Sequence, residues 1–173
     1  MISFEPHYWN IKRQIIAEEY LYDTYNSTFS SSLIDYKFWC IHGEPVIIVV
    51  MCNRKNQIIG AQKMKDNRKF YAYTYDLDWN LRTDILTDFP LENNSLNLPK
   101  PKCLKDMIEV FKVLSKPFPT VRVDLYEVND RVYFGEMTFT PGGNLNYFTE
   151  EFFLQMGEKI NLSMVKPKMK KWF

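Results

Sequence analysis

Apolar residues in the first half of the chain gather in short runs that are typical of β-strands. Residues 35–42 and 45–52 are rich in aromatic and β-branched side chains and are separated by a Gly-Glu turn, which predicts a hairpin. The second run is apolar on both faces, so both strands should lie inside a sheet. An aromatic run at 69–75 predicts another strand, and the short apolar run at 14–22 predicts a buried strand that leads into a connector.

The second half of the chain predicts a helix, a hairpin and a second helix. Residues 102–115 carry apolar side chains at steps of three and four, which is the spacing of an amphipathic helix. Residues 120–128 and 132–139 predict a hairpin, and Thr149 followed by two glutamates predicts the start of another helix. This order of elements predicts an α+β fold in which an antiparallel sheet has helices packed on one face.

The composition limits the class of protein. With 46% apolar residues in 173, the chain can bury one core, and we expect one domain over residues 14–162, a lead-in over 1–13 and a basic tail over 163–173. The net charge of +1 gives no reason to expect nucleic acid as a partner. Three cysteines without a C-x-x-C pair argue against zinc and disulfides. No apolar run approaches the ~20 residues of a transmembrane segment, so we expect a soluble, cytoplasmic protein.

The second hairpin places charged residues together. If residues 129–131 form the loop, Asp124 lies opposite Glu136 and Arg122 lies opposite Thr138, all on one face. The other face is then apolar, with Leu125 opposite Gly135. A loop of two residues would slip the register and bury one carboxylate in the apolar layer, which costs several kcal/mol. We therefore expect the three-residue loop.

Two carboxylates this close repel each other unless a positive charge lies between them. A hard divalent cation that prefers oxygen ligands is one solution, and Mg²⁺ is the natural candidate. Arg122 bridging the two acids in a surface ladder of charges is the other. The spacing alone leaves both open.

The residues around this hairpin resemble a known family. Val121-Arg-Val-Asp124 and Glu136-Met-Thr-Phe-Thr-Pro-Gly-Gly143 resemble the metal-binding hairpin of ATP-grasp ligases, R-x-D on one strand and E-x-N-x-x-P-G on the next. The chain is more similar still to the TupA-like ATP-grasp family of capsular and teichuronopeptide polysaccharide biosynthesis, whose members are often assigned as glycosyltransferases. Its signatures match residues 35–45, 118–126, 133–143 and the Lys-Pro pair at 100–101. The similarity covers about residues 15–162 and implies the C-terminal ATP-grasp subdomain.

The resemblance also implies roles for individual residues. Asp124 and Glu136 would bind Mg²⁺, with Thr138 where most members have Asn, and Arg122 would lie beside the transferred phosphate as a catalytic residue. The implied ATP contacts are Glu18 at the adenine amino group, backbone groups of Glu19, Tyr20 and Leu21 at the adenine edge, Asp35 at the ribose, and Lys37 and Arg54 at the phosphates.

Three functions remain open. The first is the C-terminal part of an ATP- and Mg²⁺-dependent carboxylate–amine ligase that acts on a polysaccharide or amino-sugar substrate. The second is a noncatalytic nucleotide-binding or assembly module, because no glycine-rich loop precedes Glu18 and Thr138 replaces Asn. The third is a glycosyltransferase, for which Asp76-x-Asp78 is the only D-x-D motif. We expect the phosphate-binding front half to be encoded separately or supplied through a homo-oligomer, so whether this chain alone is an enzyme stays open.

Overall fold

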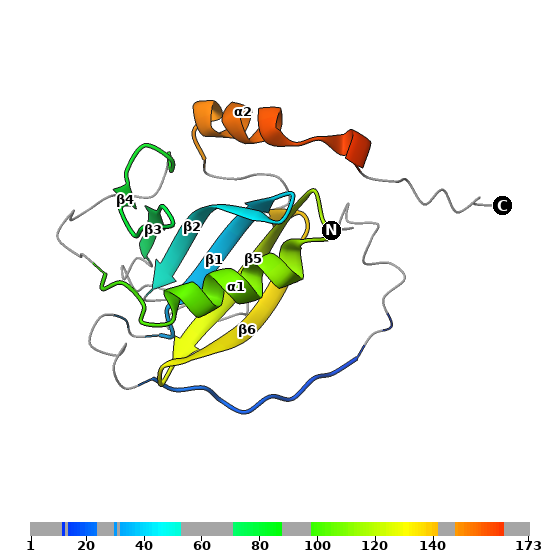
Figure 1. Cartoon of the computed structure of the whole chain (residues 1–173). Helices are drawn as coiled ribbons and strands as arrows, with labels where there is room; N and C mark the ends of the chain where they lie inside the picture. Colours follow the sequence, from blue (N-terminus) through cyan, green and yellow to red (C-terminus); the bar gives the residue numbers. More distant parts are fainter. Residues whose placement is uncertain are drawn as a thin grey trace, which may run out of the picture.

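The computed structural model describes residues 12, 14–23, 30, 32–52, 71–87, 98–141 and 148–164. Within this part, six antiparallel strands form one sheet in the order β4-β3-β2-β1-β5-β6 (Figure 1). The strands are β1 (Asp35–Ile41), β2 (Glu44–Cys52), β3 (Tyr71–Tyr75), β4 (Leu81–Arg82), β5 (Thr120–Val128) and β6 (Arg131–Thr138), and the helices are α1 (Leu104–Ser115), α2 (Glu150–Lys159) and a 3₁₀ turn at Leu162–Met164.

The central strands are buried on both sides, as their apolar runs predicted. Every residue of β1 is buried, and β1 pairs with β2 on one side and with β5 on the other. The first hairpin turns at His42 and Gly43, both of which have positive φ angles. This is the backbone of a two-residue turn whose twist matches that of the strands.

Helix α1 covers one face of the sheet. Its buried side chains Leu104, Met107 and Phe111 join a core with residues such as Phe38 and Val123. The rings of Phe38 and Phe111 lie 5.4 Å apart. Full burial of one such side chain contributes about 1.5–3 kcal/mol, so this face anchors β1 and β5 side by side.

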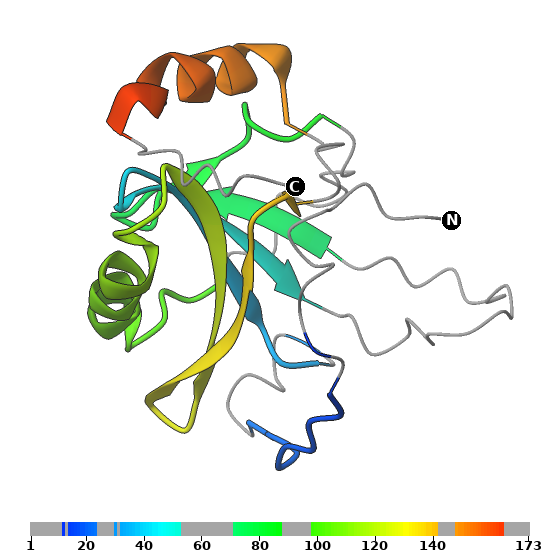
Figure 2. The ribbon, with the colours of Figure 1, turned by 90° about the vertical axis from the view of Figure 1, so that its right-hand side faces the viewer.

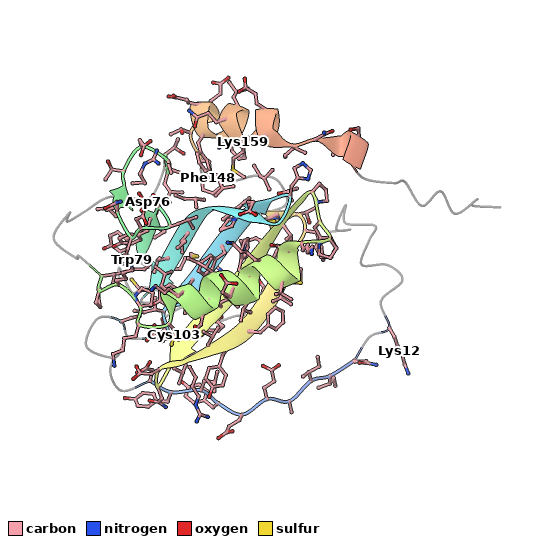
Figure 3. All side chains as sticks on the ribbon, in the orientation of Figure 1. Lys12, Asp76, Trp79, Cys103, Phe148 and Lys159 are labelled. Carbon is pink, nitrogen blue, oxygen red and sulfur yellow. The ribbon has the colours of Figure 1, made fainter. Side chains whose placement is uncertain are left out.

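Helix α2 lies on the other face, which corrects the prediction that the helices pack on one face. Phe148, Phe152 and Met156 join a second core with Trp39 and Ile47, whose side chains point away from α1. Phe148 lies between α2 and the strands (Figure 3). Because β1 and β2 are apolar on both faces, each face needs its own cover. The α+β class and the antiparallel sheet are confirmed.

The second hairpin differs from the prediction at its turn. Asn129 and Asp130 have φ angles of 52° and 60°, and Val128 pairs with Arg131, so the loop has two residues rather than three. A β-bulge between Asp124 and Leu125 then shifts the register by one, and Leu125 pairs with Phe134 instead of Gly135. Beyond the bulge, Asp124 pairs with Glu136 and Arg122 with Thr138, as predicted. The bulge corrects the slip that the shorter loop introduces.

Gly135 is the extra residue in this bulge. A Cβ atom built there would lie 2.8 Å from Cε2 of Tyr126 and 3.0 Å from the backbone oxygen of Asp124. The backbone of β6 therefore passes too close to β5 for any side chain at this position. Glycine at 135 permits the bulge, and the bulge places the two carboxylates on one face.

Residues 14–22 do not form the buried strand that the sequence predicted. No strand is assigned to them, and Ile15, Ile16 and Tyr20 are exposed. Figure 2 shows this segment, in dark blue, below the strands. An apolar run becomes a strand only where a sheet edge accepts its backbone hydrogen bonds.

Within the described residues, no helix is long and apolar enough to cross a membrane.

Candidate functional site

A pocket of about 730 Å³ opens on the side of β1, β5 and β6 that faces away from α1. It is lined by charged residues of the three strands and by part of the N-terminal segment. The lining consists of Glu18, Glu19, Tyr20, Leu21, Leu33, Asp35, Lys37, Met51, Arg122, Asp124, Tyr126, Phe134, Gly135 and Glu136. Most of the residues that the sequence analysis assigned to a site therefore meet in one place.

Strand register explains why they meet. Lys37 pairs with Asp124, and Asp124 pairs with Glu136, so one row of charged side chains crosses three strands. In the next row Arg122 pairs with Thr138. Directly paired residues share a face of the sheet, so both rows lie on the face that carries the pocket. Arg122 lines the pocket, whereas Thr138 is not among its lining residues.

At the buried end of this group of charged side chains, Lys37 makes two ionic contacts. Its Nζ lies 2.7 Å from Oδ2 of Asp35 and also donates to Oδ2 of Asp124. The Lys37 side chain is 10% exposed and the two aspartates are 2% exposed. An unpaired charge at this depth costs several kcal/mol, so Lys37 and the two aspartates depend on one another.

Arg122 joins the buried end of the cluster to its exposed end. Its Nε donates to Oδ1 of Asp124 at 2.7 Å, and its Nη2 donates to Oδ2 at 2.8 Å. The same Nη2 lies 2.9 Å from Oε1 of Glu136 and 3.0 Å from Oγ1 of Thr138. Of the two solutions left open by the sequence, the structure contains the arginine bridge.

Electrostatics favour a charged Arg122 in this position. Burial lowers its pKa, but the hydrogen bonds to Asp124 and the charges of Asp124, Glu136 and Asp35 outweigh burial, and the pKa lies above its ordinary value. The three carboxylates exceed the two cations Lys37 and Arg122 by one charge. Glu18 and Glu19 at the rim add further negative charge. The pocket thus keeps a small surplus of negative charge, although its two most central carboxylates, Asp124 and Glu136, are already bound by Arg122.

The oxygen atoms on this face fit Mg²⁺ only if Arg122 moves away from them. Asp124, Glu136 and Thr138 offer the oxygen atoms that this ion prefers. Among the described residues, no group of three or more His, Cys, Asp or Glu side chains is placed to hold a metal. Arg122 contacts all three oxygen-bearing side chains. A metal at this position therefore needs Arg122 to move and further ligands besides these three side chains.

The residues expected to contact ATP differ in how the structure places them. Glu18, Glu19, Tyr20 and Leu21 line the pocket from an irregular segment rather than from a strand. Asp35 also lines it but is ion-paired with Lys37, so Lys37 is bound to carboxylates in this arrangement. Arg54 lies outside the described residues.

Sequence reasoning missed several apolar lining residues. Met51 pairs with Asp35 across β1 and β2, and Tyr126 lies two residues beyond Asp124 on β5. Alternation along each strand, applied once the register was known, would have found both. Phe134 lies two residues before Glu136 on β6, so the same alternation would have found it.

The D-x-D motif has a structural explanation. Oδ1 of Asp76 accepts hydrogen bonds from the backbone of Asp78 and Asn80, and Oδ2 accepts one from the Asn80 side chain. Trp79, beside them, stacks on Tyr75 with ring centroids 4.1 Å apart. Asp76 and Trp79 lie at the β3–β4 turn (Figure 3). The motif shapes a turn and gives no support for a nucleotide-sugar site.

In this antiparallel sheet, one hairpin places an R-x-D sequence opposite a glutamate. This is the arrangement that the resemblance to ATP-grasp proteins predicted. The family model described as TupA-like ATPgrasp matches residues 2–161. The chain therefore belongs to the TupA-like ATP-grasp family, as its motifs indicated. Neither the curated proteins nor the solved structures gave a significant match.

Proposed function

We propose that the pocket binds Mg-ATP and that the chain is the nucleotide-binding part of a carboxylate–amine ligase. The observation that carries this proposal is the pairing of Asp124 with Glu136, bridged by Arg122, at an open pocket in a member of an ATP-grasp family. ATP-grasp proteins generally bind ATP and Mg²⁺. The acceptor would belong to cell-surface polysaccharide biosynthesis, which rests on the family resemblance alone.

In the proposed reaction, a substrate carboxylate oxygen attacks the γ-phosphorus of ATP, the bond to the bridging oxygen breaks, and ADP leaves. An amine then attacks the acyl carbon, loses a proton, and releases phosphate. When bound, Mg²⁺ would neutralise charge on the phosphate oxygens. Asp124, Glu136 and Thr138 would hold the ion.

The chain's own residues would bind and orient the nucleotide. Arg122 would turn from the carboxylates to the γ-phosphate and stabilise negative charge as it develops. Glu18 and the backbone of residues 19–21 would contact adenine, and Asp35 the ribose. Lys37, bound to Asp35 and Asp124, would hold those carboxylates in place.

We further propose that other phosphate-binding cations come from a separately encoded half or from a second copy. Among the described residues that line the pocket, Lys37 and Arg122 are the cations, and both are bound to carboxylates. A triphosphate carries more charge than these two side chains can offset. Exposed apolar side chains beside the pocket, Tyr20 and Phe134, would suit such a contact.

Calorimetric titration with ATP, with and without Mg²⁺, tests the proposal. Asp124→Asn and Glu136→Gln should each weaken the metal-dependent part of ATP binding. Arg82→Gln is the matched control, because it removes an exposed arginine–aspartate pair far from the hairpin in sequence. Unchanged binding in both hairpin variants would refute the metal site. Metal-dependent binding without ADP formation, even with a partner, would favour the noncatalytic module.

A further inference from the structure

Arg122 contacts the same oxygen atoms that a metal at this site would need. It holds both oxygens of Asp124, Oε1 of Glu136 and Oγ1 of Thr138. A guanidinium Nε carries one hydrogen and an Nη2 carries two, so four contacts share three hydrogens. At least one contact is therefore weaker than an ordinary hydrogen bond.

The contacts of Arg122 differ in strength along its length. Asp124 is buried and is held on its other side by Lys37, whereas the Glu136 side chain is 62% exposed. Ion pairs at exposed sites contribute little, and buried ones break at a high cost. The contacts to Glu136 and Thr138 are thus the ones that Arg122 can give up.

A free divalent ion has little to gain at this site. To bind Asp124 and Glu136, the ion would displace Arg122 and leave the guanidinium without a strong anionic partner: of the other carboxylates in the lining, Asp35 is paired with Lys37, and Glu18 and Glu19 are exposed. A triphosphate supplies that anion. Its oxygens can accept hydrogen bonds from Arg122 as the contact to Glu136 is released, and they compensate for any loss of the contact to Asp124.

We infer that Arg122 is a built-in counter-cation that excludes free divalent metal from the Asp124–Glu136 pair, so that metal enters together with the triphosphate. This rests on the proposed function, in which the pocket binds Mg-ATP. Arg122 would thus act in binding, before the phosphoryl-transfer step, by coupling the binding of the metal to the binding of the nucleotide. By linkage, each ligand raises the affinity of the other by the same factor.

Electron paramagnetic resonance of Mn²⁺, titrated alone without nucleotide, tests the inference. The wild-type chain should show no saturable binding below about 1 mM Mn²⁺. Arg122→Gln should tighten Mn²⁺ binding about tenfold or more, because the competing cation is gone. The double variant Arg122→Gln with Glu136→Gln should lose that gain. Arg82→Gln, the control, should bind Mn²⁺ as the wild type does.

Two results would overturn the inference. One is saturable, submillimolar Mn²⁺ binding by the wild type, and this result can be obtained without any variant. The other is equal Mn²⁺ affinity in the wild type and in Arg122→Gln. If Arg122→Gln does not fold, Arg122→Lys takes its place. Lysine keeps the charge but cannot contact all three partners, so a smaller gain in Mn²⁺ affinity is expected. No gain in Mn²⁺ affinity would overturn the inference. Because no titration contains nucleotide, a wild type that fails to bind Mg-ATP refutes the proposed function separately.

Discussion

Gly135 is the residue on which the geometry of the charged hairpin most depends, and Gly135→Ala tests this. A Cβ at this position would lie 2.8 Å from Cε2 of Tyr126 and 3.0 Å from the backbone oxygen of Asp124. The Tyr126 ring can shift, but the Asp124 carbonyl belongs to a central strand. Overpacking of this kind costs about 1–3 kcal/mol, whereas alanine gains about 0.4–1 kcal/mol through the unfolded state. We expect a net loss of about 1–2 kcal/mol in the free energy of unfolding.

Gly157→Ala is the matched control for this substitution. Gly157 lies in α2, is exposed, and has no atom within 4 Å of a built Cβ. Alanine there should stabilise the chain by up to about 1 kcal/mol, because glycine is a poor helix former. The same substitution should thus have opposite signs at the two sites. Urea denaturation followed by circular dichroism measures both.

The size of the Gly135→Ala effect on function follows from the same geometry. If β6 moves away from β5 to make room, Glu136 moves relative to Asp124, and metal-dependent ATP binding should weaken along with stability. Gly157→Ala should leave that binding unchanged. If Gly135→Ala is as stable as the wild type, the close approach at the bulge is not what places the carboxylates, and the reasoning is refuted.

Three further predictions concern other sites. Burial raises the pKa of Glu127 above its usual 4.5, so the stability that its protonated form contributes is present below pH 4.5 and is lost as the pH rises through the raised pKa. In urea titrations, the stability of Glu127→Gln relative to the wild type should therefore increase between about pH 4 and pH 7.5. A difference that stays constant with pH would contradict this. Asp35→Ala should weaken binding of ATP more than of 2′-deoxy-ATP in calorimetry, whereas equal losses would remove Asp35 from the ribose. The purified chain alone should release little or no ADP from Mg-ATP in a coupled assay, and robust turnover by the monomer would refute the need for a partner.

The sequence alone determined the elements that depend on local patterns. The apolar runs of β1 and β2 gave two interior strands, and the spacing of Leu104, Met107 and Phe111 gave α1. Thr149 caps α2 as its residue type predicted, since its side chain accepts a hydrogen bond from the backbone of Phe152. The pairing of Asp124 with Glu136 was also predictable from the sequence. Because one face of the hairpin is an apolar layer, the charged residues must lie together on the other face.

Only the tertiary structure decided features that depend on contacts distant in sequence. The two-residue turn and the bulge at Gly135 give the same pairing at Asp124 as a three-residue loop would, so hydrophobic pattern cannot distinguish them. Residues 14–22 look like a strand by composition, but a strand also needs the edge of a sheet to pair with. The placement of Lys37 between Asp35 and Asp124 follows from the pairing of β1 with β5, more than 80 residues apart. Such pairings are fixed by the packing of the whole sheet, which no local segment encodes.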